Sequence, residues 1–177
     1  MAGTVTVEEV LANANGNTGR IRLVIDAILR ALQTNLPAVL AHCGLPAING
    51  YFWAGEIIGE DNFPAISVAG STTKEAHGTG YTNRTHLVCA CVFPLPISRR
   101  DWQVSADVAD LITAVMFCPT FRGPYCEAEA DPHAWHALIP RGPQPLPPSP
   151  DRDYGGMAAH FEAVQHAAGP NTNPYWS

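Results

Sequence analysis

The residues of this chain that could bind a metal are cysteines and histidines in its second half. They are Cys89, Cys91, Cys118, Cys126, His133 and His136. A zinc site needs four such ligands to converge, and these spacings differ from those of zinc fingers and ribbons. On a β-strand Cys89 and Cys91 would share one face, where a buried cysteine packs as a small hydrophobe. We therefore predict that the cysteines are structural, and zinc binding is the alternative.

The other patterns that could support catalysis are weak. A cysteine nucleophile needs a histidine beside its thiol, but the adjacent His42 and Cys43 would point apart on a helix. The glycines are isolated and no Gly-Lys-Ser or Gly-Lys-Thr follows them, which argues against a phosphate-binding loop. The acidic cluster of Glu127, Glu129 and Asp131 is typical of a solvated loop. We expect no catalytic residue, no metal ion and no cofactor, and hence no enzyme.

The cysteine count and the apolar stretches indicate where the protein works. Five cysteines are an odd number, and Met1–Val10 has neither a basic region nor an apolar core of the kind that export signals carry. We expect free thiols in a protein made in the cytoplasm. Leu23–Leu32 is apolar but contains charges and is shorter than the roughly 20 residues of a membrane span, so no membrane partner is expected.

Charge and composition favour binding to other protein subunits. The 177 residues suit one domain, and only 15% of them are charged, against about 25% in an average soluble domain. The net charge is −6, and Arg99–Arg100 is the only adjacent basic pair, so nucleic-acid binding is disfavoured as a primary activity. Because few charges cover the surface, we expect part of it to be buried in a homo-oligomer.

The elements that must position these residues begin with helices. Thr6–Glu9 has the form of a capping box, which predicts a short helix Val7–Asn13. From Arg20, apolar residues recur at helical spacing as far as Leu32. Pro37 is expected to start a separate short helix, Ala38–Cys43, which Gly44 ends.

A second strong helix is predicted after the prolines at 94 and 96. Ser98 can cap its N-terminus with Asp101 in the first turn, and the helix should end before Pro119. Its expected inner face is Trp102, Ala106 or Val108, Leu111, Ile112, Val115 and Met116.

Two β-strands are expected in the middle of the chain. Phe63–Val68 and Arg84–Phe93 are rich in β-forming residues and should pair antiparallel. Gly70–Asn83 between them is rich in Gly, Thr and Ser, which predicts an exposed loop or a long mobile hairpin tip. Such loops carry contacts with partners. The interface residues predicted here are Lys74, Glu75, His77 and Tyr81.

The last third of the chain gives weaker signals. Trp135–Ile139 could be a strand, and residues 140–150 hold six prolines, which predicts an extended connector. Met157–Gln165 fits either a strand or a helix, and we predict a strand because apolar residues alternate there. The tail 169–177 is expected to be ordered only against a partner.

Together these elements predict an α+β fold: one domain over residues 1–177, with an antiparallel β-sheet and a long hairpin packed against two or three α-helices. Their order resembles that of the tail terminator proteins of tailed bacteriophages. The anchors of the resemblance are the proline-led strand FPAISV (Phe63–Val68) and the helix ILRALQTNLPAVL (Ile28–Leu40). The resemblance covers roughly Ile21–Gln165.

The resemblance implies a structural virion protein without cofactor or chemistry. Such a protein forms a sixfold ring on the end of the tail tube, stops tube growth and joins the tail to a head-side neck protein. DNA would pass through the lumen of the ring without specific binding. The alternatives are another neck or tail-completion protein, a small Cys/His zinc-binding protein, and a monomeric adaptor that binds one partner through Gly70–Asn83.

Overall fold

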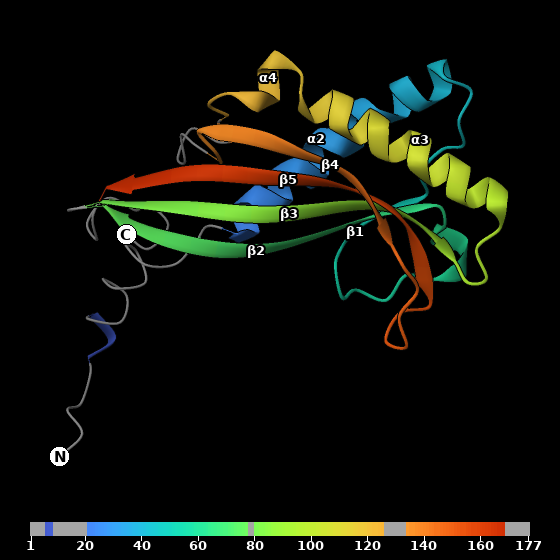
Figure 1. Ribbon diagram of the computed structural model, residues 1–177, viewed down its shortest axis with the longest axis horizontal. Helices are drawn as coiled ribbons and strands as arrows, with labels where there is room; N and C mark the ends of the chain where they lie inside the picture. The colour runs from blue at the N-terminus through green and yellow to red at the C-terminus, as the bar shows by residue number, and fades with distance from the viewer. Residues whose placement is uncertain (1–5, 9–20, 78–79, 126–133, 169–177) are drawn as a thin grey trace.

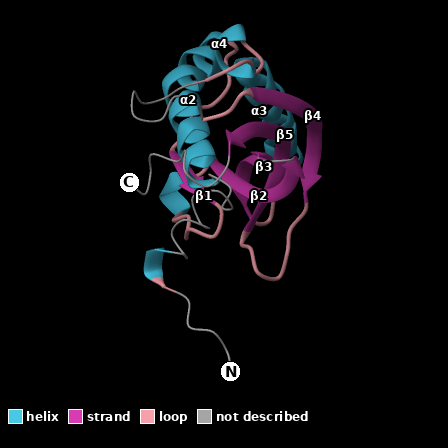
Figure 2. Ribbon diagram, turned by 90° about the vertical axis from the view of Figure 1, so that its left-hand side faces the viewer, coloured by secondary structure: helices cyan, strands magenta, loops and turns pink. Residues whose placement is uncertain are grey.

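The protein is an α+β fold with a five-stranded sheet and helices on one of its faces (Figures 1 and 2), as the sequence predicts. The computed structural model describes residues 6–8, 21–77, 80–125 and 134–168. In chain order the elements are α2 (Ile21–His42), β1 (Gly50–Trp53), a 3₁₀ turn (Glu60–Asn62), β2 (Ala65–His77), β3 (Gly80–Pro94), α3 (Arg99–Met116), α4 (Pro119–Arg122), β4 (Ala137–Leu146) and β5 (Tyr154–Ala168). The strand order is β1-β2-β3-β5-β4. β1 runs parallel to β2, and every other neighbouring pair is antiparallel.

Helix α2 confirms the predicted apolar periodicity but corrects the break expected at Pro37. The helix runs without interruption from Ile21 to His42, with Pro37 inside it. Leu36 and Leu40, on either side of the proline, are both fully buried. Their burial holds the helical path, while the exposed proline ring costs only one backbone hydrogen bond. Gly44, at φ 66°, ends the helix as predicted, and the Leu45 amide donates to the Leu40 carbonyl at 3.0 Å.

The length and composition of α2 would also allow it to cross a membrane. One such helix is weak support for a span, because the core helix of a soluble protein has the same properties. Here the apolar side of α2 packs in the main core, with Val24, Ile28 and Leu32 fully buried. The packing accounts for the apolar composition without a membrane.

Helix α3 begins as the sequence predicts. The Ser98 hydroxyl accepts a hydrogen bond from the Asp101 amide at 3.1 Å, and the Asp101 carboxylate accepts one from the Ser98 amide at 3.3 Å. This is a complete capping box. The buried face includes Val108, Ile112 and Met116, while Trp102 and Leu111 are only half-buried. Of the two alternatives for the first turns, Val108 is buried and Ala106 is not.

The segment Gly70–Asn83 belongs to a long β-hairpin, so the hairpin alternative of the prediction is confirmed and the loop alternative is wrong; residues 78 and 79 lie outside the described residues. β2 continues to His77 and β3 starts at Gly80, and the two stay in register from Ala65↔Val92 to His77↔Gly80. Threonines stabilise the ladder, since the Thr72 and Thr85 hydroxyl oxygens lie 3.0 Å apart across the strands. The Gly, Ser and Thr composition that indicates a loop is equally compatible with a strand whose neighbours supply the pairing.

The two C-terminal strands, β4 and β5, complete the sheet next to β3. β5 confirms the predicted strand, extends it in both directions, and lies between β3 and β4. Residues 140–146 of the expected connector belong instead to β4, which is an edge strand of the sheet. Proline is tolerated there because an edge strand leaves one side without hydrogen-bonded neighbours.

The short strand β1 was not predicted from the sequence. Of the expected helix Val7–Asn13 only residues 7 and 8 are described, and both are helical; the tail 169–177 lies outside the described residues.

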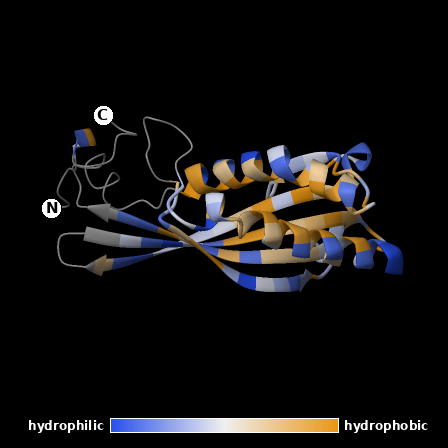
Figure 3. Ribbon diagram, turned by 90° about the horizontal axis from the view of Figure 1, so that it is seen from above, coloured by the Kyte–Doolittle hydropathy of each residue, from blue (hydrophilic) through white to orange (hydrophobic). Residues whose placement is uncertain are grey.

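The two faces of the sheet differ in what covers them. Alternate residues of β2 and β3, such as Ile66, Val68 and Leu87, pack against α2 and α3 in the main core. The opposite face carries a smaller cluster around Ala65, Ala90, Val92 and Ala158. Figure 3 shows that β2, β3 and β5 continue past the helices as a more hydrophilic extension.

Helix α3 is joined to the sheet at one close approach. The Ser105 hydroxyl donates to the Cys91 carbonyl at 2.6 Å and accepts from the Met157 amide at 2.5 Å, and Ser105 is fully buried. Gly156 lies beside this contact, where an added Cβ would stand 2.0 Å from the Cys91 carbonyl oxygen. One hydroxyl therefore satisfies backbone groups of both β3 and β5.

Candidate interaction surface

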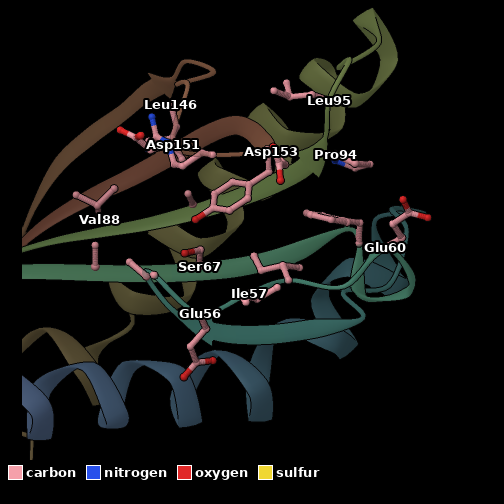
Figure 4. Close-up of a pocket in the computed structure, with 18 residues that line it drawn as sticks. Glu56, Ile57, Glu60, Ser67, Val88, Pro94, Leu95, Leu146, Asp151 and Asp153 are labelled. Carbon is pink, nitrogen blue, oxygen red and sulfur yellow. The ribbon is translucent and has the colours of Figure 1, made fainter.

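A cavity of about 750 Å³ opens on the sheet face that the helices leave uncovered (Figure 4). Its floor comes from alternate residues of β2 and β3, including Ser67, Ala69, Val88 and Ala90. In β2 the floor residues Ser67 and Ala69 are small, whereas the neighbouring Ile66 and Val68, which face the helices, are larger and pack in the main core. The hollow exists because small side chains line this end of the sheet while segments on two sides rise above it.

Two loops form the walls of the cavity. One follows β1 and contributes residues 54–58, Glu60 and Phe63; the other precedes β5 and contributes residues 151–154. The rings of Phe63 and Tyr154 approach with centroids 6.4 Å apart. A backbone hydrogen bond from the Leu95 amide to the Asp153 carbonyl, 3.0 Å long, ties the second loop to the end of β3.

The rim of the cavity combines exposed apolar side chains with negative charge. Ile57 is 95% exposed, the most exposed large hydrophobic residue of the described chain, and Leu95 is also exposed. The charged lining residues are Glu56, Glu60, Asp151, Asp153 and Arg152. Four carboxylates against one guanidinium leave the rim negative, and the Arg152 side chain already donates to the Pro147 carbonyl at 2.9 Å. Such a surface suits an apolar group that carries a positive charge beside it.

Towards the extension, the same face carries a chain of charges across four strands. The buried carboxylate of Glu162 on β5 accepts from Arg84 on β3 at 2.6 Å and from Arg141 on β4 at 2.5 Å. Arg84 also meets Glu75 on β2 at 3.3 Å. The hydrogen bonds from Arg141 and Arg84 lower the pKa of Glu162, against the opposing effect of burial. Arg141 lies at a bulge in β4 next to Gly142, whose φ of 84° favours glycine.

The predicted interface residues all lie on the β2–β3 hairpin. Lys74 is half-buried, and Glu75 is exposed and paired with Arg84. In the backbone ladder His77 pairs with Gly80 and Tyr81 with Ala76, while the side chains of His77 and Tyr81 lie outside the described residues. Lys74 and Glu75 are consecutive on a strand and so point to opposite faces, which means that the structure does not gather the four into one patch.

Of the described cysteines, Cys89 and Cys91 follow the structural interpretation, whereas Cys43 and Cys118 do not. Cys89 and Cys91 are buried on one face of β3, and burial raises the pKa of each thiol to about 12. Cys43 and Cys118 are exposed and free, and Cys126 and His133 lie outside the described residues. Within the part of the chain that the structure describes, no three metal-binding side chains come together.

No family model matches the sequence, and a search of curated proteins finds no match either.

The cavity is the candidate site that sequence reasoning missed. Its loops have no regular periodicity, and two of its walls are about 90 residues apart in the chain. One signal was available: in β2 the small residues Ala65, Ser67 and Ala69 alternate with the larger Ile66 and Val68. Alternation of this kind indicates that one sheet face lacks bulky packing.

Proposed function

We propose that the chain is a ring-forming tail terminator of a tailed bacteriophage. In this role it caps the tail tube, ends tube polymerisation and joins the tail to the head-side neck. Its partners are other copies of itself, the tail tube protein and a neck protein, and its location is the virion. DNA passes through the lumen without specific binding.

The observation that carries the proposal is the two-sided sheet. Helices cover one face, and the other keeps an open, partly apolar cavity with Ile57 and Leu95 exposed at its rim. A subunit of a closed ring needs two different surfaces, because each copy meets a different face of its neighbour. The order of the elements, the low share of charged residues and the extension of β2, β3 and β5 are consistent with the resemblance.

Deletion of the gene tests the proposal directly. A tail tube without its terminator has nothing to stop growth or accept a head, so electron microscopy of the lysate should show DNA-filled heads and separate tails, many of abnormal length. Supplying the wild-type chain from a plasmid should restore joined virions. Normal joined virions from the deletion, or tails of normal length that lack only fibres, would place the protein elsewhere.

A further inference from the structure

The corner between α3 and α4 carries a second exposed apolar surface. Phe117, at the C-terminal end of α3, is 47% exposed. The Arg122 guanidinium lies over its ring, with its central carbon 5.6 Å from the ring centroid. Cys118 and Pro119 beside them are exposed. An exposed aromatic ring with a cation at its face is typical of the residues that anchor protein interfaces.

This corner and the cavity are complementary in chemistry. The cavity is lined by apolar side chains and has a negative rim that includes Glu56, Glu60 and Asp153. The corner offers an aromatic side chain with a positive charge next to it. Burying the ring in the cavity would remove apolar surface of both partners from water and bring Arg122 to the acidic rim.

We propose that the Phe117–Arg122 corner of one subunit docks into the cavity of a second copy. The proposal deepens the ring-forming function proposed above and rests on it, because it names the contact between neighbouring subunits. The corner cannot fill the cavity of its own chain, since α3 packs on one face of the sheet and the cavity opens on the other.

Charge also selects the geometry of the contact. Two corners placed face to face would bring Arg122 against Arg122, and two cavities would bring their acidic rims together. Like charges across an interface disfavour both two-fold arrangements. The corner-to-cavity contact pairs opposite charges and joins two different surfaces, which is the head-to-tail geometry of a ring.

A disulfide between neighbouring subunits tests this contact. The native Cys118 sits on the corner, so the triple variant Cys43→Ser, Cys126→Ser and Ile57→Cys places one thiol on each surface. It removes Cys43, the other exposed cysteine of the described residues, and Cys126, which lies outside them. Mild oxidation of concentrated purified protein, and of particles assembled with the variant, should give dimers and longer linked chains on a non-reducing gel. Adding Cys118→Ser should abolish the ladder. A thiol placed at the exposed Gln103, on the outer side of α3, should give none.

Substitutions at the corner give an independent measure. Phe117→Ala should raise the dissociation constant of self-association by roughly tenfold or more, as loss of an anchor residue does. Arg122→Glu should weaken association, and Asp153→Lys in the same chain should restore it, since the pair exchanges its charges. Association unchanged by Phe117→Ala, or no ladder in either purified protein or particles, would overturn the proposed contact.

The two proposals fail separately. If the gene deletion has the terminator phenotype but no Cys118-dependent ladder forms, the function stands and the contact is wrong. If the ladder forms in purified protein but the deletion yields normal virions, the corner-to-cavity contact stands and belongs to an oligomer with another role.

Discussion

Three strands of the sheet are connected through the carboxylate of Glu162, and the contact of Arg84 with Glu75 extends the connection to β2. Only 3% of Glu162 is exposed, yet its two oxygens accept from Arg84 and Arg141 on the strands to either side. A buried carboxylate is tolerated when charged donors satisfy both of its oxygens. Loss of the carboxylate would leave both arginines without their strongest partner, although their own exposure to water limits the cost.

We predict that Glu162→Gln lowers the free energy of unfolding by about 1.5–3 kcal/mol, the range for hydrogen bonds to charged groups. The matched control is Glu75→Gln at the exposed end of the same charge chain, which should change it by less than about 1 kcal/mol. Denaturant unfolding of the three proteins measures both effects. Equal losses of unfolding free energy in the two variants would show that the buried ion pairs of Glu162 stabilise the fold no more than the exposed pair of Glu75.

The same residue gives a pH dependence with a definite sign. The pKa of Glu162 is lowered in the folded protein from its ordinary value of 4.5, so the unfolded chain binds the proton more readily. Its contribution to stability is therefore complete above pH 4.5 and is lost as the pH falls below that value, through the lowered folded pKa. The stability difference between wild type and Glu162→Gln should shrink over that acidic window in unfolding titrations. A difference that grows on acidification would contradict the ion-pair interpretation.

Among the elements, α3 contacts the sheet through its apolar face and also through one buried hydroxyl. Ser105 satisfies the Cys91 carbonyl and the Met157 amide together. Because Ser105 is fully buried, water cannot replace the hydroxyl without a rearrangement of the helix.

We predict that Ser105→Ala lowers the free energy of unfolding by roughly 1–3 kcal/mol, the cost of a buried backbone group left unsatisfied. Thr113→Ala is the control on the same helix, since its hydroxyl only donates to the Ala109 carbonyl of its own helix at 3.0 Å. That change should stay within about 0.5 kcal/mol. Thermal and denaturant unfolding would measure both. Equal losses of stability in the two variants would mean that the hydrogen bonds of Ser105 to the sheet contribute no more than a hydrogen bond within the helix.

Over the whole molecule, the sheet divides into a part covered by helices and an extension beyond them (Figure 3). Hydrogen exchange should follow this division. Amides of Ile66–Val68 lie in the covered part and should exchange most slowly, and those of Thr73–Glu75 should exchange faster in the free subunit. If the extension contacts partners, assembly should slow exchange there. Equal, strong protection before and after assembly would show that the extension is already part of the rigid body.

The sequence by itself determined the elements whose signals are local. The apolar spacing of Ile21–Leu32 and the capping box of Ser98 and Asp101 act within a few residues, so α2 and α3 could be predicted. The β-forming residues at 84–93 likewise predicted a strand with Cys89 and Cys91 on one face, and alternation favoured a strand over a helix at 157–165.

Only the tertiary structure decided the features that depend on neighbours distant in the chain. Pro37 stays helical because burial of Leu36 and Leu40 outweighs the lost hydrogen bond, and residues 70–77 form a strand because β3 pairs with them. The prolines of β4 are accepted because that strand lies at an edge. The cavity needs two loops that are far apart in the chain and meet only in the folded protein. Each outcome is set by long-range packing and pairing, whose free energies exceed local propensity and cannot be read from local sequence.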